Sequence, residues 1–77
     1  MKKNSFEGKT VHDYRAIGMK HGALDAQQDL EMNAQANKRL WEHLEGLHGQ
    51  YRDNVKIVLL NGYNEGYTKA KEYFNNL

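Results

Sequence analysis

The stretch LLNGYNEGYTKA, residues 59–70, constrains the fold of this chain more than any other feature of its sequence. An Asn-Gly pair after an apolar run is a strong signal for a β-hairpin turn, so a strand could end at Asn61 and Gly62. The same stretch places Gly62, Gly66 and Ala70 four residues apart, which aligns three small residues on one face of a helix. The two interpretations exclude each other, because strand and helix need different backbone dihedral angles.

A helix fits the rest of the chain better than a strand. The run VKIVLL would need strand partners, and no other segment alternates β-branched or aromatic residues with polar ones. The small-residue spacing also occurs a second time, 44 residues earlier. The first small face consists of Gly18, Gly22 and Ala26, and the second of Gly62, Gly66 and Ala70. We therefore predict helices through both segments.

The four glycines of these two small faces need a compensating interaction. Each glycine inside a helix lowers the stability of that helix by about 1 kcal/mol relative to alanine. Small residues spaced by four let two helix backbones come close together, as they do in membranes. We therefore predict that the two small faces pack against a helix, either each other or the helix of a second subunit. The alternative is that these glycines are tolerated points of a kink or loop.

Composition favours a single, marginally stable helical domain. The 77 residues include 39% hydrophobic residues, no proline and no cysteine. A chain of this length buries only about 60% of its unfolded surface, and it has no disulfide to compensate. We expect one helical domain over residues 1–77, with residues 1–8 as a flexible arm. The predicted fold is all-α: a small bundle or helical hairpin of two or three helices at about 10–27, 30–46 and 53–75, completed by self-association, with a homodimer favoured.

The ends of these helices have local signals. Thr10 followed by Asp13 forms a loose capping box, which predicts a helix start. An apolar stripe at helical spacing follows: Val11, Tyr14, Ile17, His21 and Leu24. The phase of the apolar pattern then changes at 27–33, which leaves open whether residues 10–45 form one helix or two. Two glycines at 46 and 49 predict a chain reversal, after which Asp53 or Asn54 can cap the last helix.

No set of residues predicts catalysis or metal binding. The four histidines, at 12, 21, 43 and 48, are not spaced by three or four as ligands on one helix face would be. The chain has no cysteine, only Ser5 as a serine nucleophile, and no glycine-rich phosphate loop after a strand. We therefore expect no enzyme activity, catalytic residue, metal or cofactor. The longest apolar run, 57–60, is too short to cross a bilayer, so we expect a cytoplasmic protein with no membrane partner.

Two partner surfaces remain as candidates. Aromatic residues beside a glycine face can cover the backbone of a partner, which makes Trp41, Tyr63 and Tyr67 candidates for binding a protein. The net charge of +1 gives no overall attraction to nucleic acid. A local patch could still form if the chain reverses near His48. Its candidate residues are Lys38, Arg39, Arg52 and Lys56.

The GYxxGYxxA segment, residues 62–70, resembles small helical proteins of phages and mobile elements. That resemblance implies a protein that occupies a surface on a larger host protein. We therefore expect a non-enzymatic helical interaction module, acting as a stoichiometric inhibitor or adaptor of a larger protein of unknown identity. The alternative function is a small nucleic-acid-associated regulator that uses the local basic patch.

Overall fold

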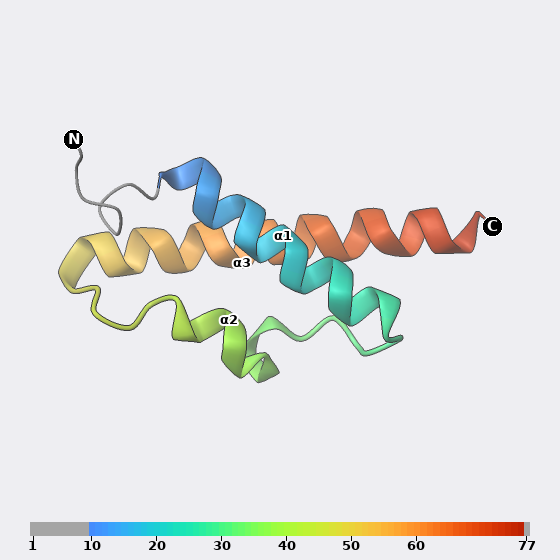
Figure 1. Cartoon of the computed structure of the whole chain (residues 1–77), viewed down its shortest axis with the longest axis horizontal. Helices are drawn as coiled ribbons and strands as arrows, with labels where there is room; N and C mark the ends of the chain where they lie inside the picture. The colour runs from blue at the N-terminus through green and yellow to red at the C-terminus, as the bar shows by residue number, and fades with distance from the viewer. Residues whose placement is uncertain (1–9, 77) are drawn as a thin grey trace.

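The structure, a computed structural model, describes residues 10–76, so the arm expected at 1–8 lies outside the described part. These residues form helices and turns and contain no strand, which confirms the all-α prediction (Figure 1). The elements are α1 (Val11–Gln27), the 3-10 turn η2 (Ala34–Ala36), α2 (Lys38–Glu42) and α3 (Gly49–Asn75). The Asn61-Gly62 pair lies inside α3, so it is part of a helix and does not form a hairpin turn.

Polar caps fix both ends of α1. The Thr10 hydroxyl accepts a hydrogen bond from the Asp13 N–H at 3.2 Å, and the Asp13 carboxylate accepts one from the Thr10 N–H at 2.9 Å. This confirms the predicted capping box. At the other end Asp29 has a φ of 61°, and the Leu30 N–H reaches back to the Asp25 carbonyl at 2.9 Å. That pattern is a Schellman motif, in which a left-handed residue ends the helix. The phase change at 27–33 is therefore a helix end.

The predicted helix at 30–46 is wrong in extent. Only η2 and the five-residue α2 form there, because the segment bends to place separate side chains in the core. The Asn37 side chain caps α2 by accepting from the Leu40 N–H at 3.0 Å, and the Trp41 indole donates to the Ala34 carbonyl at 2.9 Å. The last helix also begins earlier than predicted, at Gly49 and not near 53. Both glycines of the reversal have positive φ, 83° at 46 and 63° at 49.

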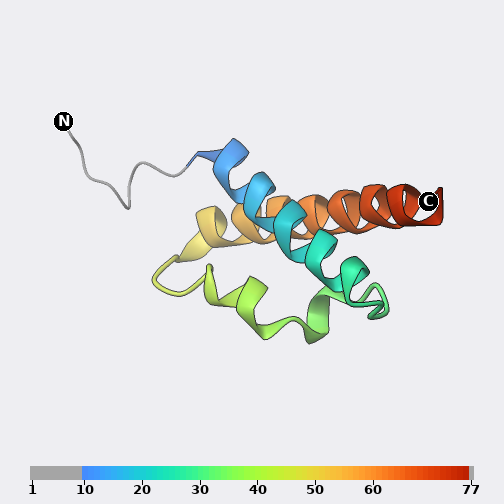
Figure 2. The same cartoon turned by 45° about the vertical axis from the view of Figure 1, so that its right-hand side comes forward.

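Helices α1 and α3 run in the same direction, and residues 28–48 return along them (Figures 1 and 2). The contacts agree with this parallel arrangement, since Gly18 faces Leu59 and Tyr63 while Gly22, one turn later, faces Tyr63 and Tyr67. The molecule measures 44 × 25 × 16 Å. It is therefore an elongated helix pair with a connecting segment along one side.

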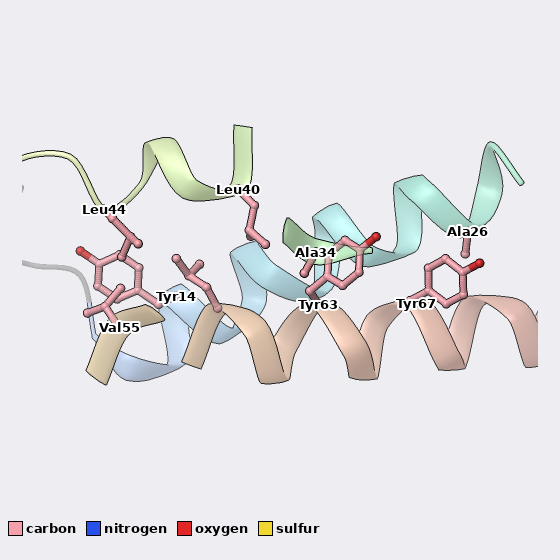
Figure 3. Packing of buried hydrophobic residues seen from close by; sticks show 9 residues of the cluster. Tyr14, Ala26, Ala34, Leu40, Leu44, Val55, Tyr63 and Tyr67 are labelled. Atoms are coloured by element: carbon pink, nitrogen blue, oxygen red, sulfur yellow. The ribbon is translucent and has the colours of Figure 1, made fainter. Parts of the chain in front are cut away.

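The core lies between this pair and the connecting segment, where α3 contributes most of the large side chains (Figure 3). Tyr63, Leu40 and Leu59 are fully buried. The apolar stripe predicted for α1 does not coincide with the buried face, because Val11 is 63% and Leu24 42% exposed. The buried residues of α1 are Tyr14, Gly18, Gly22 and Ala26, so this helix buries its small face.

Candidate interaction surface

The four glycines lie where α1 and α3 touch, and each faces the backbone of the opposite helix. A Cβ atom at Gly22 would meet the Tyr63 carbonyl oxygen and lie 2.8 Å from the Tyr67 nitrogen. One at Gly66 would meet the Met19 carbonyl oxygen and lie 2.6 Å from the Met19 Cα. Gly18 and Gly62 face Leu59 and Arg15 in the same way. The two small faces therefore pack against each other within one chain.

The 44-residue offset between the two small faces equals the register of the parallel pair. Gly18 and Gly62 lie at the same level of the interface, as do Gly22 and Gly66, because each helix advances by one turn between them. Ala26 is buried at the end of this seam, and Ala70 is half-buried. Since the four glycines are buried against the backbone of the opposite helix within the chain, their Cα atoms cannot serve as the contact with a second copy.

Tyr63 and Tyr67, predicted to contact a partner, are instead inside the molecule, with exposed fractions of 0% and 8%. The Tyr63 hydroxyl donates to Asp25 Oδ2 at 2.6 Å and accepts from the Asn33 N–H at 3.4 Å. The Tyr67 hydroxyl donates to the Leu30 carbonyl at 2.6 Å. Burial, together with the Asp25 carboxylate, raises the pKa of Tyr63 to about 12. These two residues hold the connecting segment on the helix pair, so they are not available to a partner.

The third predicted partner contact, Trp41, is half-buried against the same core. Its indole N–H is already used by the Ala34 carbonyl. Within residues 10–76, the aromatic residues that do face solvent are Tyr51, Tyr73 and Phe74, with exposed fractions of 52%, 63% and 40%.

A cavity of about 720 Å³, which we call the polar cavity because most of its lining residues are polar or charged, opens between α1 and the connecting segment. Its lining includes Asp25, Asn37, His21 and the predicted nucleic-acid residues Lys38 and Arg39. Arg52 and Lys56 lie on the first turns of α3 and do not line it. The cavity therefore contains only half of the predicted basic group, together with the carboxylate of Asp25.

His21, which lines this cavity, contacts a second histidine. The rings of His21 and His43 meet edge to face, with centroids 5.7 Å apart. Burial lowers the pKa of His21, and the nearby His43, Lys20 and Arg39 lower it further, while Asp25 opposes them. The neutral form of His21 is thus favoured in the fold, so we expect this contact between α1 and the C-cap residue of α2 to weaken in acid.

An apolar groove, which we call the open face, lies where α1 and α3 meet the solvent. It has a volume of about 560 Å³, and only α1 and α3 contribute to its lining. The lining residues are Ala16, Met19, Lys20 and Ala23 from α1, and Gly66, Lys69 and Ala70 from α3. None of them lines the polar cavity, which lies against the connecting segment.

The apolar stripe of α3 continues beyond the open face. Tyr73 and Phe74 follow Gly66 and Tyr67 by seven residues each, so they extend the side of α3 that packs against the rest of the molecule. Their rings pack edge to face on each other, 5.4 Å between centroids, and both remain exposed. Helix α1 ends before it reaches them, at Gln27 (Figure 1).

Of the residues that line the open face, the sequence analysis named only Gly66 and Ala70 as site candidates, and it named none at the exposed end of α3. A signal was present: Ala16, Met19 and Ala23 recur at helical spacing on α1 next to its glycines. Without the parallel arrangement, however, that row cannot be aligned with Ala70 and Tyr73 on α3.

Ion pairs border the open face. Glu65 accepts from both Arg15 and Lys69, the latter at 3.0 Å, and farther along Lys71 binds Asp29 at 2.9 Å. These cations lower the pKa of Glu65 and of Asp29. Lys20, on the other rim of the groove, has no ion pair among residues 10–76.

Neither protein-family models, nor curated proteins, nor solved structures gave a match to this chain. Within residues 10–76, no three side chains of His, Asp or Glu gather in a way that could hold a metal ion. No helix in the same range is long and apolar enough to cross a membrane.

Proposed function

We propose that this protein is a non-enzymatic helical module that binds another protein through its open face. The observation that supports this most is the apolar groove between α1 and α3, which leads to the exposed Tyr73 and Phe74 and has no cover among residues 10–76. Exposed apolar surface that is rimmed by charge is typical of protein interaction sites. By covering a surface of a larger protein in this way, the module would act as a stoichiometric inhibitor or adaptor.

Site-specific photo-crosslinking in the native host tests this proposal. A benzoylphenylalanine at Met19 or Tyr73 would lie on the proposed surface, while one at Thr68 would lie on the exposed outer side of α3. We expect one adduct of defined mass from positions 19 and 73 and none from 68. An adduct of twice the chain mass identifies a second copy as the partner. Absence of adducts at both test positions, with the protein expressed and folded, would refute the proposal.

Four cations on either side of the chain reversal support the second function, a nucleic-acid-associated regulator. Lys38, Arg39, Arg52 and Lys56 make no ion pair within residues 10–76, so their charges are not neutralised there. Binding through such cations weakens steeply as salt rises. Titration with duplex DNA and with RNA at several salt concentrations, using wild type and the Lys38→Glu plus Arg52→Glu double variant, distinguishes this function. No binding at low salt would remove it.

A further inference from the structure

The walls of the open face determine what can occupy it. The side chains of Ala16, Met19, Ala23 and Ala70 offer no hydrogen-bond donor or acceptor, apart from the weakly accepting sulfur of Met19. The backbone groups below them are paired within α1 and α3. An occupant must therefore satisfy its own backbone hydrogen bonds, which a helix does and an extended peptide does not.

The shape of the groove selects large apolar side chains. Its floor consists of alanine and glycine, with Met19 as its one large apolar residue, so the volume of about 560 Å³ is left empty by small residues. A helix that presents bulky aliphatic or aromatic side chains at spacings of three and four would fill this hollow. A helix surfaced with small residues would leave the hollow unfilled and lose that contact area.

The rims of the groove carry positive charge on both sides. Lys20 stands on the α1 rim without an ion pair in the described chain, and Lys69 on the α3 rim is 65% exposed. Glu65 is the carboxylate next to Lys69, and Arg15 already shares it. Glu72 lies one helical turn beyond Lys69 and does not line the groove. The net charge of the rims thus favours carboxylates on the occupant.

These observations together point to one class of partner. We propose that the open face binds an acidic amphipathic helix of another protein, whose bulky apolar stripe fills the groove and whose Asp or Glu residues face Lys20 and Lys69. This inference rests on the proposed function and specifies its partner. Two cations beside an apolar floor do not suit a nucleic acid, which requires rows of phosphate contacts.

Selection from a displayed library of single-helix peptides tests the partner class. The library randomises the apolar stripe and the two flanking positions, and the folded wild-type protein is the bait. We expect bulky aliphatic residues in the stripe and Asp or Glu at the flanks. The double variant Lys20→Glu plus Lys69→Glu should select Lys or Arg at the flanks instead.

Matched variants locate the binding site of the selected peptides. Ala23→Arg fills the groove and should weaken binding by about tenfold or more, whereas Thr68→Arg on the outer side of α3 should leave affinity within about twofold. Thermal melts of each variant show that it folds. Flanks without acidic enrichment, affinity unchanged by Ala23→Arg, or no binders at all would overturn the inference. If the peptide experiments fail while crosslinks still form at positions 19 and 73, the proposed function stands and this class of partner is excluded.

Discussion

At the scale of single residues, the interface glycines decide how closely α1 and α3 approach. The atoms nearest to an added Cβ at all four glycines belong to the backbone of the other helix, not to a flexible side chain. A backbone cannot turn aside as a side chain can, so any larger residue has to push the helices apart. The cost of four glycines in helical positions is thereby offset by close backbone packing.

Replacing Gly22 by alanine should therefore destabilise the protein although alanine favours helix. The substitution gains about 1 kcal/mol in helix propensity but forces overpacking near the upper end of the usual range, about 3 kcal/mol. We expect a net loss of about 2 kcal/mol, which corresponds to a fall in melting temperature of about 8–16 °C.

Urea and thermal unfolding, followed by circular dichroism, measure this loss. Thr68→Ala, on an exposed position of the same helix pair, is the control and should be neutral or slightly stabilising. A Gly22→Ala protein as stable as the wild type would show that the helices are not in backbone contact at this position.

A second prediction at the residue scale concerns the Tyr63 hydroxyl. It donates to Asp25 at 2.6 Å and accepts from the Asn33 N–H, so it joins α1, α3 and the connecting segment. Tyr63→Phe keeps the ring and removes both hydrogen bonds, which should cost about 1–2 kcal/mol because one partner is a partly exposed carboxylate. Tyr73→Phe, at an exposed position, should change stability by less than about 0.5 kcal/mol. Equal effects of the two substitutions in urea unfolding would contradict the role of Asp25.

At the scale of elements, the contact between α1 and the C-cap residue of α2, His43, should depend on pH. The fold lowers the pKa of His21 below its usual value because of burial and the neighbouring His43. A histidine with a lowered pKa binds its proton less readily in the folded state than in the unfolded state. Stability should therefore be complete above about pH 6.5 and fall as the pH drops below it, where the unfolded state takes up more protons.

Urea titrations at about pH 7.5 and pH 5.5, on either side of the usual histidine pKa, test this direction. The His21→Gln variant removes the titrating ring, so its stability should change less between the two pH values than that of the wild type. His12, exposed at the start of α1, provides the control, and His12→Gln should behave like the wild type. The same pH dependence in all three proteins would contradict a role for the contact between His21 and His43.

The C-terminal end of α3 should be less stable locally than the middle of this helix. Its central turns contain Leu59, Tyr63 and Tyr67, whereas the last turn contains Tyr73 and Phe74, which are exposed and have no other helix of residues 10–76 packed on them. Hydrogen exchange should accordingly be slowest at 59–67 and approach unprotected rates beyond Lys71. Strong protection of residues 73–75 in the isolated protein would show that something covers this end, and protection that appears only at high protein concentration would identify a second copy.

At the scale of the whole molecule, sequence patterns predicted the helices better than their arrangement. The Thr10 capping box and the small-residue spacing at 62–70 are local signals, and both specify helix in the structure. The prediction for the middle segment failed because Ala34, Trp41 and Leu44 recur at helical spacing in the sequence and yet pack on the core from separate short turns. Periodicity cannot distinguish these cases, since the core that receives these residues is built from distant parts of the chain.

The candidate site was harder to predict than the fold. Tyr63 and Tyr67 looked like surface aromatics because the direction of their side chains depends on where the connecting segment runs. That path follows from α1 and α3 being parallel, and the only trace of this in the sequence is the equal spacing of the two glycine faces. The open face also depends on the parallel arrangement of α1 and α3, because an antiparallel hairpin would pair Met19 and Ala23 with different residues of α3.

The parallel arrangement itself is testable by distances between spin labels. The chain has no cysteine, so pairs of introduced cysteines can be labelled without background. With a register of 44 residues, position 12 lies at the level of position 56. Labels at His12 and Asp53 should therefore be separated along the axis by only about 5 Å, and labels at His12 and Asn75 by about 28 Å. An antiparallel pair would reverse this order. A longer distance for the 12 and 53 pair than for the 12 and 75 pair would exclude the parallel fold and, with it, the open face formed by α1 and α3.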